Sequence, residues 1–122
     1  MSATTRPNTR NLFVVVDAMD VATITALFAE DGRVVFGNGQ PIVGLDEIRT
    51  GITAFLDTIA GQHHAIVKEW NVGDETIVEL KVTYTRKDDQ QATIPCVTIF
   101  HTDSAGKIDD YRVYFDVAPI YA

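Results

Sequence analysis

The chain of 122 residues has a net charge of −7 at pH 7; 46% of its residues are hydrophobic and 22% are charged. This length suits one domain with a buried core, and the negative charge disfavours nucleic acid and anionic membrane surfaces as partners. No apolar run reaches the ~18 residues of a membrane span, and the first residues lack the order of a signal peptide. The single cysteine, Cys96, cannot form an internal disulfide. We therefore predict one cytoplasmic domain over residues 1–122, with residues 1–8 as a loosely attached tail.

Three helices are predicted in the first half of the chain. Residues 11–19 are ambiguous, because three successive valines favour a strand whereas Leu12 and its apolar neighbours fit a helical stripe. We predict a helix there. Asp20 is a suitable N-cap for a second helix over residues 21–31, which Gly32 would end.

Asp46 is a similar N-cap for the third helix. Apolar residues follow it at helical spacing over residues 48–59, and Gly61 would end this helix. Between the second and third helices, the segment "RVVFGNGQPIVG" over residues 33–44 predicts a short strand, a Gly-Asn-Gly turn and a second short extended piece.

The second half of the chain predicts four strands in an antiparallel meander. They cover residues 63–72, 76–85, 92–102 and 107–116, and short segments of turn-forming residues join them. Helices that precede such a meander pack on one face of its sheet. The sequence therefore predicts an α+β domain with three N-terminal helices on a curved, mostly antiparallel sheet.

Alternation along the strands predicts which side chains face the helices. In the second strand, the apolar residues from Val78 to Tyr84 are expected to face inward. In the first strand, His64 shares its parity with Trp70, so both are expected to face inward as well. In the last strand, the inward face is expected to carry Asp109, Tyr111, Val113 and Phe115, and the outward face Asp110, Arg112, Tyr114 and Asp116.

The third strand is apolar on both of its faces. Cys96 and Phe100 lie on one face, and Val97 and Ile99 lie on the other. A strand buried on both sides needs a second covering layer, which no other segment of the chain can supply. We therefore predict a homodimer through the outer face of the sheet.

Motifs for well-known chemistry are absent from the sequence. It contains no common nucleotide-binding, serine-hydrolase or zinc-protease pattern. His63 and His64 are adjacent, so alternation sends them to opposite faces of a strand and they cannot bind one metal together. We predict neither a metal site nor a cofactor, and we interpret Cys96 as inert packing. His64 is either a satisfied histidine of the core or dimer, or an acid or base that contacts a ligand.

Four segments of the chain carry a family resemblance. They are "ALFAEDGRVVF", "VGLDEIRTGI", "VELKVTYTRKD" and "GKIDDYRVYFD". Together with the order of helices and meander, they resemble the nuclear transport factor 2-like superfamily over residues 10–118. Within it, the chain is most similar to SnoaL-like proteins and more distantly to ketosteroid isomerase and limonene-1,2-epoxide hydrolase. The resemblance implies a cone-shaped fold that encloses a pocket, on which enzymes, binding modules and structural proteins are all built.

The catalytic residues of these relatives are absent from the matching positions. Alignment with the isomerase places its proton-shuttling aspartate at Phe36, its oxyanion-binding tyrosine at Leu12 and its protonated aspartic acid at Thr98. The residues that hold water in the epoxide hydrolase are also replaced. The acid of the last strand, in both the hydrolase and SnoaL-type cyclases, falls on Val113.

Two functions therefore remain open. The first is a SnoaL-like enzyme that performs acid-base isomerisation, cyclisation or hydrolysis on a small hydrophobic substrate, with His64, Tyr111 and Asp109 as catalytic residues. The second is a non-catalytic small-molecule-binding or accessory dimeric domain, which the loss of the relatives' acids favours. In either case, the pocket is predicted to be lined by Leu12, Phe36, Asn38, Trp70, Tyr84, Thr98, Phe100, Val113 and Phe115.

Overall fold

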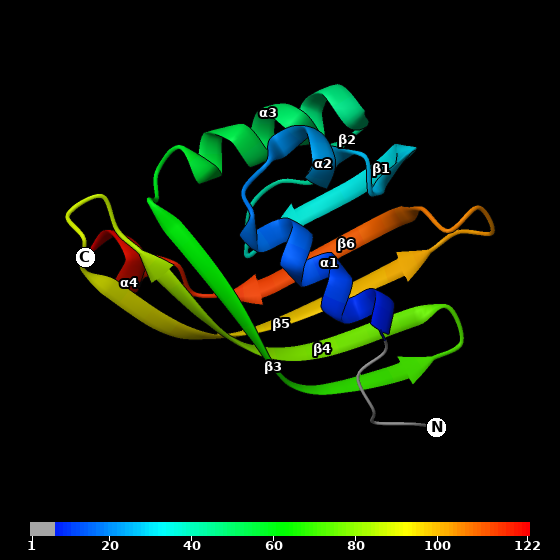
Figure 1. Ribbon diagram of the computed structural model, residues 1–122. Coiled ribbons are helices and arrows are strands. Elements are labelled where there is room, and N and C mark those ends of the chain that lie inside the picture. Colours follow the sequence, from blue (N-terminus) through cyan, green and yellow to red (C-terminus); the bar gives the residue numbers. More distant parts are fainter. Residues whose placement is uncertain (1–6) are drawn as a thin grey trace.

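The computed structural model describes residues 7–122, which form a curved sheet with helices on one face (Figure 1). The predicted tail over residues 1–8 lies outside the described residues as far as residue 6, whereas residues 7 and 8 begin the first helix. Within the described range, each helix is too short or too polar to cross a bilayer. The elements are α1 (Pro7–Asp17), α2 (Val21–Thr25), β1 (Phe28–Phe36), β2 (Ile42–Val43), α3 (Leu45–Leu56), β3 (Gly61–Val72), β4 (Glu75–Thr85), β5 (Gln91–Thr102), β6 (Ile108–Phe115) and α4 (Ala118–Tyr121).

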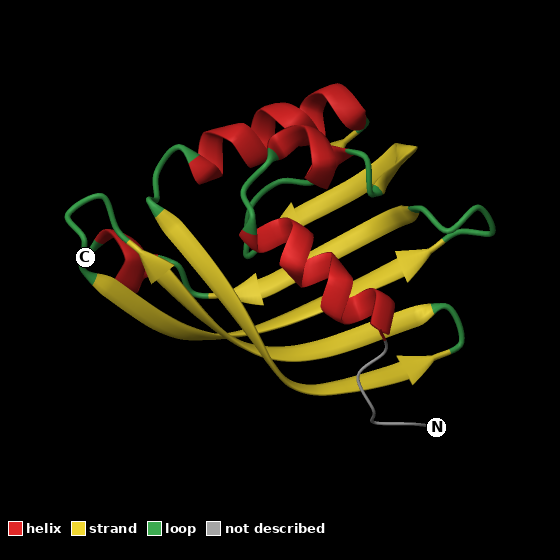
Figure 2. Ribbon diagram, in the orientation of Figure 1, coloured by secondary structure: helices red, strands yellow, loops and turns green. Residues whose placement is uncertain are grey.

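The sheet has the strand order β2-β1-β6-β5-β4-β3. From β3 to β6 each strand pairs antiparallel with the next one in sequence, which confirms the predicted meander. β1 pairs parallel with β6, and β2 pairs antiparallel with β1, so the first half of the chain extends the sheet. Figure 2 shows that the long strands bend around the side on which the helices lie. The fold is α+β with a mostly antiparallel sheet, as predicted.

The ambiguous segment over residues 11–19 forms a helix, as predicted, because it lies largely within α1. Leu12 and Phe13 are buried in the core, whereas Val14 is exposed. The three valines therefore do not prevent a helix once its apolar face packs against the sheet.

The prediction of a helix over residues 21–31 is wrong beyond its first turns. Asp20 does cap α2, since its side chain accepts a hydrogen bond from the Ala22 N–H, but the helix ends at Thr25 and β1 begins at Phe28. Phe28 pairs with Ile108 of β6. Pairing with a distant strand thus overrides the local helical pattern, and Gly32 lies within a strand rather than at a helix end.

The boundaries of the third predicted helix also differ. α3 begins after Gly44, whose φ of 90° suits glycine, and Asp46 lies in the first turn instead of capping the helix. There its negative charge is close to the positive end of the helix dipole. At the other end, α3 stops at Leu56, and Gly61 is the first residue of β3.

β4 follows the predicted alternation, because its inward residues from Val78 to Tyr84 are buried. β3 does not, since its pairing with β4 shifts register between Ile66 and Lys68. Beyond this bulge, Trp70 faces outward, with the Lys68 ammonium 5.0 Å from its ring centre. The prediction that Trp70 faces the helices is therefore wrong, because one extra residue reverses the faces of a strand.

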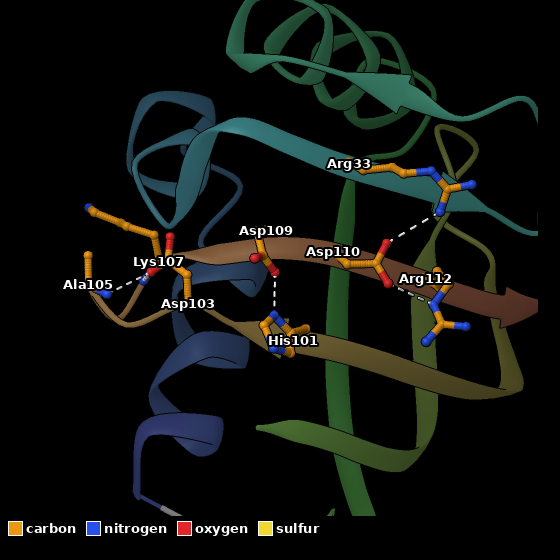
Figure 3. Close-up of polar contacts among 8 residues, drawn as sticks. All are labelled: Arg33, His101, Asp103, Ala105, Lys107, Asp109, Asp110 and Arg112. Carbon is orange, nitrogen blue, oxygen red and sulfur yellow. Dashed lines mark hydrogen bonds and ion pairs between the residues drawn. The ribbon is translucent and has the colours of Figure 1, made fainter. Parts of the chain in front are cut away.

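A second bulge changes the face of Asp109. His101 of β5 pairs with Asp110 and Thr102 pairs with Ile108, so Asp109 has no partner residue in β5. Ile108 takes the buried inward position instead. Asp109 and Asp110 both contact outward groups, as Figure 3 shows. The predicted inward position of Asp109 is thus wrong for the same physical reason as that of Trp70.

Candidate functional site

A cavity of about 60 Å³ lies between the helices and the inner face of the sheet. Its wall is mostly apolar, and its polar side chains are Gln62, His64, Tyr84, Thr98 and Tyr111. The predicted site residues in this wall are Leu12, Phe36, His64, Tyr84, Thr98, Tyr111, Val113 and Phe115.

His64 forms a close pair with Asp17 at the end of α1. The Nδ1 atom of His64 lies 2.5 Å from Oδ1 of Asp17, and the backbone N–H of His64 donates to Oδ2 at 2.9 Å. The side chains of His64 and Asp17 are only 9% and 19% exposed, and the Phe13 ring stacks on the imidazole at 5.1 Å. An ionised carboxylate only accepts hydrogen bonds, so the neutral tautomer that suits this contact has its hydrogen on Nδ1 and its lone pair on Nε2.

The chain positions this pair by tying the end of α1 to β3. The last carbonyl groups of a helix lack partners within the helix, and the side chain of Gln62 donates to one of them, the Val16 carbonyl, at 2.8 Å. Gln62 and His64 lie two residues apart in β3, so alternation directs both towards α1. This contact holds Asp17 in place for its two bonds to His64.

Two buried tyrosines add hydrogen-bonding hydroxyl groups to the cavity. Burial raises the pKa of Tyr84 and of Tyr111 far above the ordinary value, and the nearby charge of Asp17 acts in the same direction. A side-chain hydrogen bond with Thr98 partly opposes this shift at Tyr111. Both hydroxyl groups therefore stay protonated at neutral pH and are able to donate a hydrogen bond to a ligand.

Four predicted site residues lie outside the cavity wall. Asp109 and Trp70 are on the outer face of the sheet. Phe100 stacks behind Tyr111 with ring centres 6.1 Å apart, so it supports the cavity wall without lining the cavity. Asn38 lines an open cleft next to the cavity.

This open cleft, with a volume of about 310 Å³, adjoins the cavity. The two share Phe36, Phe55 and Phe115, and the rings of Phe36 and Phe55 are stacked at 6.2 Å. α4, which the sequence did not predict, forms one side of the cleft, and the hydroxyl groups of Tyr121 and Thr58 bond at 2.8 Å to hold it. Three aromatic rings therefore separate the cavity from the cleft, which we call the entrance cleft.

Sequence reasoning missed Asp17, the partner of His64. The sequence showed only that Asp17 is an acidic residue near the end of a predicted helix with an apolar stripe. Its closeness to His64, which is 47 positions away, depends on how α1 crosses β3.

Metal binding and cysteine chemistry have less support from the structure. Within residues 7–122, no three His, Cys, Asp or Glu side chains are arranged to hold a metal ion. Burial raises the pKa of Cys96 to about 11, so its thiol stays protonated and unreactive at neutral pH. The pair of His64 and Asp17, with the two tyrosines, is thus the group of side chains best placed to act on a ligand in the cavity.

The SnoaL-like domain model matches residues 9–111, so the chain belongs to the SnoaL-like family of the nuclear transport factor 2-like superfamily. No curated protein matches the chain.

Solved structures show the same fold at low sequence identity. A protein with a ketosteroid isomerase-like fold from Catenulispora acidiphila DSM 44928, in complex with trimethylamine, is 20% identical, with a TM-score of 0.84 over 96% of this chain and 91% of that one. A protein described as a SnoaL-like polyketide cyclase from Shewanella denitrificans OS-217 is 13% identical, with a TM-score of 0.79 over 95% and 96%. SalBIII, an epoxide hydrolase/cyclase-like enzyme of pyran ring formation in salinomycin, is 19% identical, with a TM-score of 0.78 over 90% and 88%. At these identities the likeness establishes the fold alone.

Proposed function

We propose that the protein is a SnoaL-like enzyme that performs acid-base isomerisation, cyclisation or hydrolysis on a small hydrophobic substrate. The observation that carries this proposal is the pair of His64 and Asp17 in the wall of an apolar cavity. Asp17 takes the role that the sequence had given to Asp109, which faces the other side of the sheet.

The chemistry follows from the hydrogen bonding of the pair. His64 Nε2 accepts a proton from the substrate, and the Asp17 carboxylate stabilises the imidazolium that forms. The hydroxyl groups of Tyr84 and Tyr111 donate hydrogen bonds to an oxygen that gains negative charge in the same step. The mostly apolar wall lowers the local dielectric constant, which strengthens each of these interactions.

The volumes of the cavity and the entrance cleft limit the size of the substrate and where its parts can lie. The cavity of about 60 Å³ is well below the roughly 300–1,000 Å³ of ordinary ligand sites, so it holds only a small part of a typical ligand. Together with the entrance cleft of about 310 Å³, the space becomes comparable to that of ordinary ligand sites. We infer that the reacting group lies in the cavity and that the rest of an apolar substrate passes the three phenylalanine rings into the cleft. Cyclase-like structural relatives support a ring-forming or ring-opening reaction.

A second candidate is a binding domain without catalysis. The positions at which relatives carry their catalytic tyrosine and acids are Leu12, Phe36, Thr98 and Val113, and all of them line the cavity here. This apolar wall favours the retention of a small hydrophobic ligand. The two functions differ in what His64 contributes, because a binding domain does not need a base at this position.

We also propose that the protein forms a homodimer through the outer face of the sheet. Ile77, Val97 and Ile99 lie side by side there and are only partly buried within one chain. The charged side chains around this apolar centre have partners in the same chain, since Lys68 lies opposite Glu79 and Asp110 forms ion pairs with Arg33 and Arg112. A twofold axis through the centre would place the apolar residues of two chains against each other.

Ligand screening followed by turnover tests the proposed function. Small cyclic ketones, epoxides and polyketide fragments that bind only the folded state raise its Tm. Each compound that binds is then incubated with the wild-type protein and with the variant His64→Gln, and the products are followed by mass spectrometry. The enzyme proposal predicts conversion by the wild type alone with binding by both proteins. Binding by both without conversion by either would instead support the binding domain.

A further inference from the structure

His64 borders two separate spaces. It lines the interior cavity, and it also lines a surface groove between α1 and β3 together with Arg10, Phe13, Asp17 and His63. No other described residue lines both spaces, and the groove shares no lining residue with the entrance cleft. His64 therefore lies between the interior cavity and the surface groove, on a side of the cavity away from the entrance cleft.

Asp17 lies close to two histidines, the buried His64 and the exposed His63. Its Oδ1 atom bonds to the buried His64, and its Oδ2 atom lies 3.6 Å from Nδ1 of His63. The side chain of His63 is 75% exposed, whereas that of His64 is 9% exposed. Adjacent residues of a strand point to opposite faces, but β3 is an edge strand, so a group at the end of α1 is able to meet both rings.

We infer that Asp17 and His63 form a proton-exchange route between the buried ring of His64 and the solvent. This inference rests on the proposed acid-base function of His64. A ligand that fills the cavity keeps water away from His64 Nε2, so a proton is able to leave the ring only from Nδ1, on the side of the groove.

The protons balance along this route. His64 takes one substrate proton on Nε2, and its Nδ1 proton passes to Oδ1 of Asp17. After rotation of the carboxyl group, Asp17 transfers this proton to Nδ1 of His63, and His63 releases one proton from Nε2 to water. The reverse transfer from water through His63 and Asp17 then restores the hydrogen on Nδ1 of His64, and the imidazolium so formed donates its Nε2 hydrogen to the product, which returns the ring to its starting state.

The distance between His63 and Asp17 is slightly longer than a hydrogen bond. A side chain with this exposure rotates freely, and one water molecule is also able to bridge the two groups. The other charged or titratable groups around Asp17 are Arg10, in the same groove, and the buried Tyr84 and Tyr111 on the cavity side. Among the histidines of the chain, only His63 combines contact with Asp17 and high exposure.

The test measures proton exchange directly in the full chain without a ligand. With the histidine rings labelled by ¹⁵N, NMR follows the exchange of the Nδ1 hydrogen of His64 with water. We expect His63→Gln to slow this exchange at least about tenfold, because an amide cannot carry the proton onward. Added free imidazole should restore the rate by acting as a mobile base in the groove.

The matched control is His101→Gln, which removes the other partly exposed histidine and should leave the His64 exchange rate unchanged. His63→Asn serves as a second variant, and the Tm of each protein checks folding. An unchanged exchange rate in both His63 variants, or the same loss in His101→Gln, would overturn the route. Because no ligand is present, this result is independent of turnover: slower exchange without any conversion of substrates would retain the route and reject the enzyme.

Discussion

Two histidine-aspartate pairs of nearly equal length occur in different surroundings. His64 lies 2.5 Å from Asp17 on the inner side of the sheet, and His101 lies 2.6 Å from Asp109 on the outer side (Figure 3). The inner pair borders an apolar cavity, whereas both side chains of the outer pair are 34% exposed. The same contact therefore occurs once beside an apolar cavity, where the histidine is buried, and once on the more exposed outer face of the sheet.

The surroundings decide what each pair is able to do. In the outer pair, the hydrogen bond that His101 donates to Asp109 and the charges of Asp109, Glu75 and Asp74 raise the pKa of His101, which favours its charged form. A charged imidazole held by carboxylates serves as an ion pair. Around the inner pair, the ring is stacked on Phe13 beside two neutral tyrosine hydroxyl groups. Of the two rings, that of His64 lines the interior cavity.

The largest expected effect is a difference in kcat between variants of the two histidines. Replacement of the base in His64→Gln should lower kcat for any substrate found by screening about 10²- to 10⁴-fold. His101→Gln, the same change in the outer pair, should leave kcat unchanged. Steady-state kinetics on both variants makes the comparison, and an equal loss in both would show that the inner position has no special role.

A smaller loss of kcat is expected when the aspartate of the inner pair, Asp17, is replaced. Asp17→Asn keeps the shape of the side chain but removes the charge that stabilises the imidazolium, so kcat should fall about 10²-fold. Asp109→Asn is the matched control and should have no effect on kcat. If Asp17→Asn raises KM alone, its role would be to shape the cavity rather than to assist proton transfer.

The outer face of the sheet is tested by oligomeric state. Light scattering should give the wild type a mass of twice the 13.4 kDa chain. Val97→Lys places a charge in the apolar centre and should give the single-chain mass, whereas Gln91→Lys, at the exposed end of the same strand, should remain dimeric. A wild-type protein with the mass of one chain at tens of micromolar would contradict the proposed interface.

The smallest effect concerns the stability that the outer pair provides. The folded state raises the pKa of His101, so this stability is complete below the ordinary value of 6.5 and is lost as the pH rises through the higher folded value. The Tm difference between wild type and His101→Gln should therefore be present in mild acid and disappear at alkaline pH. Because the pair is exposed, the difference should be only a few degrees at most. A difference that grows with pH would have the wrong sign.

The sequence predicts the meander and the regular strand β4 well, because alternation holds wherever strands pair without interruption. The predicted faces are wrong for Trp70, which follows a bulge, and for Asp109, which lies in one. The pattern of apolar residues does not reveal either bulge. The prediction also fails over residues 26–31, where pairing with β6 replaces a helix.

The candidate site was partly predictable. Alternation predicted that His64 and Tyr111 face inward, and both line the cavity because they lie on regular stretches of strand. Asp17 could not be identified, since its contact with His64 depends on the path of a helix across the sheet. Residues brought together by crossing elements leave no periodic signal in the sequence.

The central claim is that His64 presents a free Nε2 atom to the cavity because Asp17 holds the hydrogen on Nδ1. The most direct measurement is the tautomer of the His64 ring, obtained from ¹⁵N NMR of the wild-type protein at neutral pH with Asp17→Asn for assignment. The account predicts a hydrogen on Nδ1 and a lone pair on Nε2. A ring with its hydrogen on Nε2 and a lone pair on Nδ1 would contradict it.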